Sequence, residues 1–110
     1  MSYALSGIAY AWRTQRNLRI QAAIALIAAI VFVALRLPPL GLAILALTFA
    51  FVLAMEVMNT ALEALVDLAS PQVHPLAKAA KDAAAGAVLI SAGAAVLVGA
   101  LLLWHALSAR

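Results

Sequence analysis

The sequence predicts an all-α membrane protein with three transmembrane helices, and three observations lead to that fold class. Of its 110 residues, 68% are hydrophobic and only 10% are charged, which is too apolar for an ordinary soluble domain. Three long stretches of the chain carry no charge. Proline-containing segments separate the middle stretch from its two neighbours. We therefore expect one membrane domain over residues 1–110.

Residues 2–16 precede the first apolar stretch and predict an amphipathic helix that lies along the membrane surface. Leu5, Ile8 and Trp12 recur at helical spacing, with polar residues between them. Tyr3 and Tyr10 are aromatic residues of the kind that gathers at the depth of the lipid headgroups. The segment is therefore expected to rest on the membrane rather than cross it.

The apolar stretches predict three membrane spans, over about 18–36, 40–62 and 83–105. Pro38 and Pro39 cannot continue a helix, so the first two spans are expected to be joined by a tight turn. The second helix is expected to continue past its apolar part to Leu68. Prolines then interrupt the loop 67–82. In the third span, Gly86 and Gly93 lie on nearly the same face and predict close helix packing there.

The basic residues predict how the chain is oriented. Three arginines precede the first span and two lysines lie in the 67–82 loop, whereas the other side holds only Arg36 and Arg110. Positive charge favours the inner side of a membrane, so the amino terminus and this loop are expected in the cytoplasm, beside ATP. The net charge of +3 comes without a basic stripe of interleaved aromatics, so nucleic-acid binding is not expected.

Acidic and amide side chains lie at helical spacing near the end of the second span. At about 100° per residue, Glu56, Asn59 and Glu63 fall within about 60° on one face, and Asp67 follows one turn later. A carboxylate at membrane depth costs about 2.5–3.5 kcal/mol, so this stripe is expected to face a partner helix or a bound ion. Carboxylate oxygens suit Mg²⁺, which shares the rest of its shell with phosphate and water.

Simpler interpretations of these charges remain open at this point. The stripe could be a solvated helix end paired with basic residues such as Lys78 and Lys81. Lys81 and Asp82 stand where the third span enters the membrane, so Lys81 either neutralises phosphate oxygens or anchors the helix at the interface. A small transporter is a further alternative, although its ionisable groups are expected deeper in the bilayer.

Two segments together resemble the signature of the prokaryotic diacylglycerol kinase and undecaprenol kinase family. The matching residues are Glu56-x-x-Asn59-Thr-Ala-Leu-Glu63-Ala-Leu-Val-Asp67 and Ala80-Lys81-Asp82-x-x-Ala85-Gly86-Ala87-Val88-Leu89. The resemblance covers essentially the whole chain. It implies a homotrimer in the bacterial cytoplasmic (inner) membrane, with each active site at the membrane interface between neighbouring subunits.

The resemblance implies an ATP-dependent lipid kinase of phospholipid biosynthesis. Such an enzyme transfers the γ-phosphate of MgATP to the hydroxyl of diacylglycerol and gives phosphatidic acid. The alternative acceptor is undecaprenol, which gives undecaprenyl phosphate, and Arg16-Asn17-Leu18-Arg19-Ile20 is similar to the corresponding segment of undecaprenol-kinase-like members. The sequence leaves the choice between the two lipids open.

Roles for individual residues follow from the resemblance. Glu56 matches the general base, Asn59 matches the residue that positions the reacting groups, and Lys81 matches a phosphate contact. The implied nucleotide-binding residues are Gln15, Glu63, Gln72, His74, Lys81 and Asp82, with Glu63 and Gln15 also at the Mg²⁺ ion. Gln15 replaces the glutamate usual in the family and brings no negative charge, which predicts weaker metal binding, loss of one metal or a member without activity.

Overall fold

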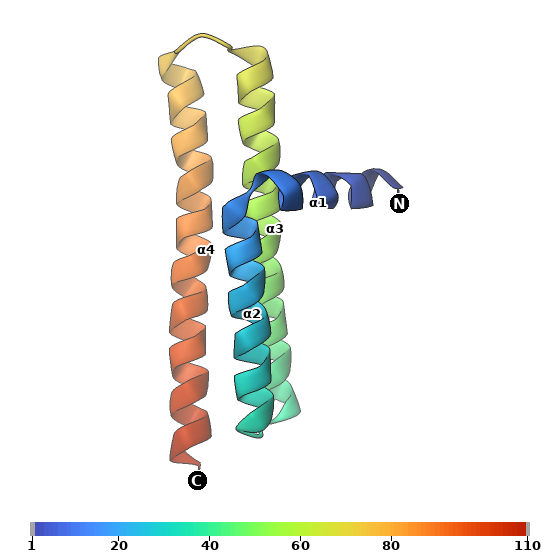
Figure 1. Ribbon diagram of the computed structural model, residues 1–110. Coiled ribbons are helices and arrows are strands. Elements are labelled where there is room, and N and C mark those ends of the chain that lie inside the picture. Colours follow the sequence, from blue (N-terminus) through green and yellow to red (C-terminus); the bar gives the residue numbers. More distant parts are fainter. Residues whose placement is uncertain (1, 110) are drawn as a thin grey trace.

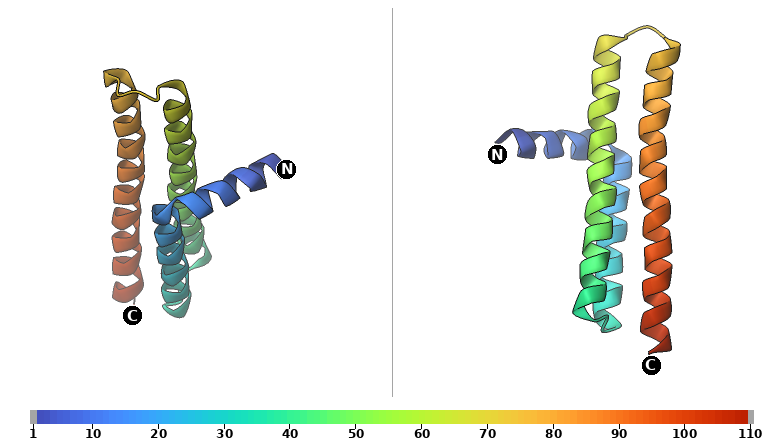
Figure 2. Two further views of the ribbon diagram at one scale, coloured as in Figure 1. Left: turned by 45° about the horizontal axis from the view of Figure 1, so that its top comes forward. Right: turned by 180° about the vertical axis from the view of Figure 1, so that it is seen from behind.

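The computed structural model describes residues 2–109, and throughout that range the regular structure is helical (Figure 1). Four helices follow one another: α1 (Ser2–Thr14), α2 (Arg16–Ala34), α3 (Pro39–Ala69) and α4 (Pro75–Ser108). Figures 1 and 2 show α2, α3 and α4 running side by side, while α1 leaves the start of α2, passes α3 and projects outward from the bundle. Arg110, which entered the charge balance above, lies outside the described residues.

Three of the helices are long and apolar enough to cross a membrane, as the sequence predicts. They are α2, α3 and α4, with 19, 31 and 34 residues. About 20 residues are sufficient to span a hydrocarbon core of about 30 Å, so α3 and α4 are longer than a span requires. Their joined ends continue past the level of α1, which makes a helical hairpin beyond the apolar part of the bundle (Figure 1).

The hairpin is more helical than the predicted loop 67–82 implies. Only residues 70–74 are non-helical, because α3 continues to Ala69 and α4 begins at Pro75. Proline suits the first helical position, where no backbone N–H is needed. The Nδ1 atom of His74 accepts a hydrogen bond from the backbone N–H of Leu76 at 3.1 Å, so this side chain caps the start of α4.

A single residue separates α1 from α2. Gln15 has extended backbone angles, φ −114° and ψ 105°, so α1 ends at Thr14 instead of reaching Arg16 as expected, and α2 begins at Arg16. The chain turns sharply at this point, which we call the elbow (Figure 1). A one-residue connection places the residues at the end of α1 close to the first turns of α2.

The turn from α2 to α3 is as tight as Pro38 and Pro39 predict. Arg36 has a left-handed φ of 60°, and the N–H of Leu37 donates to the carbonyl of Phe32 at 3.0 Å. A left-handed φ costs a non-glycine residue about 1–2 kcal/mol, which the closed turn has to offset. Leu37 is buried beneath this turn.

The buried core is small and lies beside that turn. Its main cluster consists of Phe32, Leu37, Leu45 and Ala106, and the other buried hydrophobic residues among 2–109 are Ala11, Leu18, Val52 and Ala84. Much of the remaining apolar surface is exposed, as expected for helices whose solvent is lipid. The predicted close packing at Gly86 and Gly93 is wrong within the chain, because a Cβ atom at either position meets nothing within 4 Å.

Candidate active site

Polar side chains form a stripe along α3 that rises from the interior of the bundle to the hairpin. Glu56 and Thr60 are buried, with 3% and 4% of their surface exposed, Asn59 and Glu63 are half-buried, and Asp67 is exposed. The Nδ2 group of Asn59 donates a hydrogen bond to Oε1 of Glu63 at 3.2 Å. The structure therefore brings two predicted site residues, Asn59 and Glu63, into direct contact.

Glu56 lies deepest in this stripe. The hydroxyl of Thr60 donates to the backbone carbonyl of Glu56 at 3.0 Å, which uses the main chain and leaves the carboxylate untouched. Among residues 2–109 no group donates a hydrogen bond to that carboxylate. Burying a carboxylate without a hydrogen-bond donor costs free energy of folding. In a membrane helix such a carboxylate therefore indicates a functional position.

Asn59 carries an acceptor that the chain leaves unused. Its Oδ1 atom is buried and has no hydrogen-bond partner among the described residues. The Nδ2 group of the same amide contacts the Glu63 carboxylate, so the two residues together offer hard oxygen atoms of the kind Mg²⁺ prefers as ligands. The described residues contain no cluster of three or more His, Cys, Asp or Glu side chains that could hold a metal ion. A cation held by the oxygens of Asn59 and Glu63 would take the rest of its ligands from phosphate and water, which is the way Mg²⁺ is usually bound.

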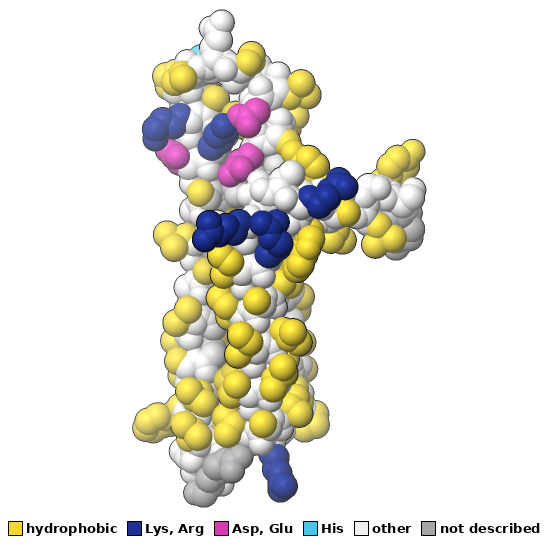
Figure 3. Space-filling view, viewed as in Figure 1, with side chains coloured by type: hydrophobic (Ala, Val, Ile, Leu, Met, Phe, Trp, Pro, Cys, Tyr) yellow, Lys and Arg dark blue, Asp and Glu magenta, His cyan; other side chains and the backbone are white. Residues whose placement is uncertain are grey.

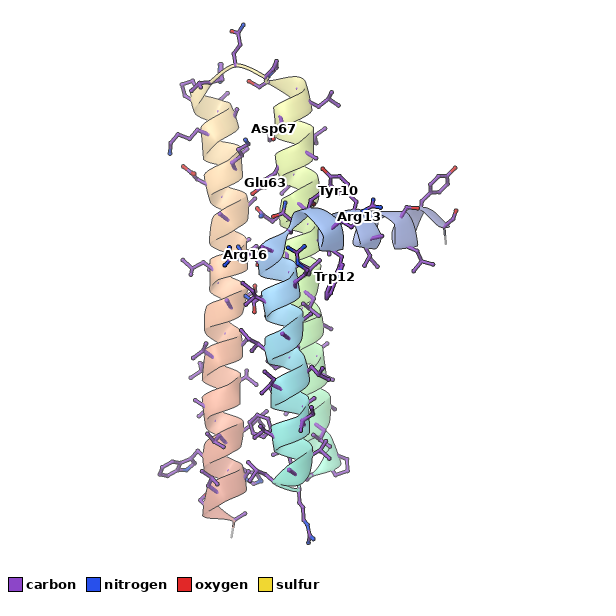
Figure 4. The ribbon with its side chains drawn as sticks, viewed as in Figure 1. Tyr10, Trp12, Arg13, Arg16, Glu63 and Asp67 are labelled. Atoms are coloured by element: carbon purple, nitrogen blue, oxygen red, sulfur yellow. The ribbon has the colours of Figure 1, made fainter. Side chains whose placement is uncertain are left out.

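Gln15, the second predicted metal neighbour, lies at the elbow and is half-buried. Figure 4 shows Glu63 and Asp67 on the hairpin side of the elbow and Arg16 at the start of α2. No hydrogen bond joins Gln15 to Glu63 in the described part of the chain.

Ion pairs organise the tip of the hairpin. The Nζ atom of Lys81 lies 2.5 Å from Oδ1 of Asp67, which links α4 to α3. The Nζ atom of Lys78 lies 2.6 Å from Oδ2 of Asp82, one turn along α4. Figure 3 shows Lys, Arg, Asp and Glu side chains gathered at and beyond the elbow, above a largely apolar surface. Charge is thus concentrated at one end of the bundle.

The ion pairs also set the charge state of the two lysines. Both precede the apolar part of α4, which begins at Ala83. The hydrogen bond from Lys81 to Asp67 raises the pKa of its ammonium above the ordinary value, and the hydrogen bond from Lys78 to Asp82 does the same for Lys78. Both lysines therefore remain cationic through neutral and mildly alkaline pH.

A pocket of about 260 Å³ lies at the hairpin tip. Four predicted nucleotide-binding residues line it, namely Gln72, His74, Lys81 and Asp82. Ligand pockets usually measure about 300–1,000 Å³, so this space suits part of a nucleotide rather than the whole. Ser70 donates to the backbone carbonyl of Gln72 at 3.0 Å, which orders the loop at the pocket edge.

An apolar groove of about 550 Å³ lies where α1, α2 and α3 meet. Its walls are Ile8, Trp12, Leu18, Ala22, Leu53, Ala54, Val57 and Met58. Val57 follows Glu56 directly, so the groove lies at the depth of that carboxylate, about 100° away around α3. The sequence alone did not predict this groove, although the four-residue spacing of Ile8 and Trp12 indicates the face of α1 that lines it.

Another pocket, of about 490 Å³, lies at the opposite end of the bundle beside the α2–α3 turn. Arg36 and His105 are among its lining residues, and among residues 2–109 no carboxylate or lysine lines it. It therefore lacks the groups that a metal-bound nucleotide requires.

The chain resembles known proteins over most of its length. A family model described as prokaryotic diacylglycerol kinase matches residues 2–103. The chain is 49% identical over 102 residues to a diacylglycerol kinase of Synechocystis sp., covering 92% of this chain and 58% of that protein. It is 40% identical over 100 residues to an undecaprenol kinase of Bacillus subtilis, covering 91% and 81%. It is 30% identical over 102 residues to the diacylglycerol kinase of Escherichia coli K12, covering 93% and 84%. The chain thus spans less than two thirds of the Synechocystis relative.

Proposed function

The chain belongs to the prokaryotic diacylglycerol kinase family, and from this membership we propose that it is a membrane-embedded, ATP-dependent lipid kinase. In the proposed reaction it transfers the γ-phosphate of MgATP to the hydroxyl of diacylglycerol and releases phosphatidic acid and ADP. The observation that carries the proposal is the stripe on α3, because it leads from a buried carboxylate to a charged hairpin.

Glu56 is the general base in this proposal. The lipid hydroxyl oxygen attacks the γ-phosphorus, the bond from that phosphorus to the bridging oxygen of ADP breaks, and the hydroxyl proton passes to the Glu56 carboxylate. Support comes from the burial of Glu56 and from its lack of a hydrogen-bond donor among the described residues, because both leave the carboxylate free to accept a proton.

The hairpin side of the stripe binds the nucleotide in this proposal. Lys81 compensates the charge of the phosphate oxygens, while Gln72, His74 and Asp82 contact the rest of the nucleotide at the tip pocket. Glu63, Asn59 and Gln15 supply oxygen ligands for Mg²⁺, which when bound to ATP neutralises the transferring phosphoryl group. Support comes from the contact between Asn59 and Glu63 and from the unpartnered Oδ1 atom beside it.

The apolar groove beneath α1 accommodates the tails of the lipid acceptor. Its lining is apolar and it lies at the depth of Glu56, so a lipid held there keeps its hydroxyl near the level where the α3 stripe begins. α1 rests on the membrane surface as an amphipathic helix in this arrangement. Diffusion of the acceptor within the bilayer then delivers it directly to the groove.

The assembly is a homotrimer in the bacterial inner membrane, with the amino terminus and the hairpin in the cytoplasm. The Lys and Arg side chains gathered towards the hairpin end support this orientation, because positive charge near the ends of membrane spans favours the cytoplasmic side. Exposed apolar side chains on the outer faces, such as Leu89 and Ile90, provide surface for neighbouring subunits as well as for lipid.

The proposal is tested by transfer of labelled phosphate from ATP to diacylglycerol in mixed micelles. Purified wild type is expected to transfer phosphate in the presence of Mg²⁺, and Glu56→Gln is expected to lose the transfer. His105→Ala, at the opposite end of the bundle, is the matched control and is expected to retain wild-type rates. The proposal is overturned if the wild-type protein transfers phosphate neither to diacylglycerol nor to undecaprenol.

Undecaprenol is the second candidate acceptor. The Bacillus subtilis undecaprenol kinase, at 40% identity, and the Arg16–Ile20 segment favour it. The same assay with undecaprenol as the sole acceptor decides between the lipids through the ratio of kcat/KM values.

A further inference from the structure

The end of α1 is held by a side chain of α2. The last four carbonyls of an α-helix lack partners within the helix, which here are those of residues 11–14. The carbonyl of Ala11 accepts from the N–H of Gln15 at 2.8 Å. The guanidinium of Arg19 donates to the carbonyl of Trp12 at 2.5 Å and to that of Arg13 at 3.3 Å. One side chain thus supplies two of the missing partners.

Arg19 is suited to this position by charge as well as by reach. It lies one turn into α2, and the one-residue connection at Gln15 brings it back to the end of α1. The carbonyl end of a helix carries a partial negative charge, so a cation there is stabilising. The planar guanidinium offers several donors, which allows it to serve both carbonyls at once.

The same contact reaches the apolar groove. Trp12, whose carbonyl accepts from Arg19, also lines the groove, together with Ile8 from α1. Leu18, the residue before Arg19, is buried and lines the groove from α2. Arg19 therefore connects the two walls that α1 and α2 contribute.

We propose that Arg19 is a positioning residue that fixes α1 across the bundle and so sets the shape of the groove for the lipid acceptor. The role rests on the proposed lipid-kinase function, and Arg19 acts through Trp12 and Ile8 rather than on the reacting atoms. The competing explanation is that Arg19 only anchors α2 at the membrane surface. Arg13 is the appropriate comparison, because it lies at the same elbow and its side chain makes no hydrogen bond within the described residues.

The first test measures phosphate transfer at saturating MgATP while the lipid mole fraction is varied. Arg19→Met removes both hydrogen bonds at similar side-chain length and is expected to raise the KM for the lipid at least tenfold, since each hydrogen bond from a charged group contributes about 1.5–3 kcal/mol. The KM for ATP is expected to stay within twofold. Arg19→Lys, which can still donate to one carbonyl, is expected to recover part of the loss. Arg13→Met is expected to resemble wild type.

The second test does not require activity. The chain has no cysteine, so nitroxide labels can be placed at Ser6→Cys on α1 and Ala23→Cys on α2, with labelled chains diluted in unlabelled protein. The distance distribution between the labels is expected to be narrow in wild type and in Arg13→Met, and to broaden in Arg19→Met. An unchanged distribution in Arg19→Met, or equal broadening in Arg13→Met, overturns the positioning role. A kinase-inactive wild type overturns the proposed function, and this distance measurement then decides the role of Arg19 alone.

Discussion

The ammonium of Lys81 lies 2.5 Å from the carboxylate of Asp67, so an ion pair joins α4 to α3 at the tip of the hairpin. The two side chains are 42% and 64% exposed, and exposed pairs contribute only about 0–1 kcal/mol to stability. The pair has a larger consequence for the proposed reaction, because Lys81, the cation expected to contact phosphate, is already paired with the Asp67 carboxylate. Nucleotide binding then exchanges a carboxylate for phosphate oxygens at Lys81.

Replacing Lys81 tests its contact with phosphate. Lys81→Met is expected to lower kcat/KM for ATP by about 100-fold, comparable to removing one donor from a developing anion. Lys78→Met is the matched comparison, since Lys78 also lines the tip pocket but pairs with Asp82 along its own helix, and among residues 2–109 no ion pair connects it to α3. A change of less than threefold is expected for this control. The measurement is the initial rate against ATP concentration at a fixed lipid concentration. Equal losses of kcat/KM in both variants would indicate a general effect of charge at the hairpin tip.

The Asp67–Lys81 pair also predicts a pH effect. The hydrogen bond to Asp67 raises the pKa of Lys81, so the folded protein retains this cation to a higher pH than the unfolded chain does. The contribution of this ion pair to the free energy of unfolding is complete below the pKa that Lys81 has in the unfolded chain. It is lost as the pH rises through the higher pKa of Lys81 in the folded protein. Asp67→Asn is expected to move the alkaline limb of the kcat/KM profile to lower pH. A profile that stays in place would contradict the role of Lys81 as the cation that titrates there.

Glu56→Gln keeps the volume of the side chain and removes its basicity. Loss of a general base is expected to lower kcat by about 10²–10⁴-fold. Binding of MgATP, followed with a fluorescent nucleotide analogue, is expected to stay within twofold because Glu56 lies two helical turns below Glu63. Glu63→Ala, in contrast, is expected to weaken nucleotide binding and turnover together. A Glu56→Gln variant with wild-type kcat would remove the carboxylate from the mechanism.

Gln15 predicts an unusual Mg²⁺ requirement. Because its amide brings no charge, Gln15→Glu is expected to lower the Mg²⁺ concentration for half-maximal rate about fivefold, as added ligand charge raises cation affinity. Thr14→Glu places the same charge on the neighbouring residue and is the control, with a shift of less than twofold expected. The rate is measured against free Mg²⁺ at fixed ATP. Equal shifts in both variants would assign the effect to surface charge and not to ligation.

The all-α fold and the order of its helices can be predicted from local features of the sequence. Uncharged stretches of span length predict α2, α3 and α4, and the prolines at 38, 39 and 75 predict where α3 and α4 begin. The extent of the helices in the hairpin was harder to predict from the sequence. Charged residues in 67–69 and 75–82 suggest a loop, yet both segments are rich in Ala and Leu, which favour helix, and α3 and α4 continue through them.

The site was only partly accessible from the sequence, because its contacts are set by tertiary structure. Helical spacing places Asn59 and Glu63 together, and they form a hydrogen bond. The bond from Arg19 to Trp12 depends on the angle at the elbow, which no periodicity encodes. The apolar groove likewise needs three helices to converge, so its lining residues resemble ordinary lipid-facing positions in the sequence.

A bulky side chain in the apolar groove tests whether the lipid acceptor binds there. Ala54 lines the groove on α3 and is exposed to it, so Ala54→Trp adds an indole to a space of about 550 Å³. The KM for the lipid is expected to rise about tenfold, because the indole occupies volume that apolar tails need and each excluded methylene forfeits about 0.8 kcal/mol of burial. Ala43→Trp, also exposed on α3 but outside the groove lining, is the control and is expected to leave the KM unchanged. The KM for ATP is expected to stay at the wild-type value in both variants. Equal lipid KM values for Ala54→Trp and Ala43→Trp would place the acceptor elsewhere on the bundle.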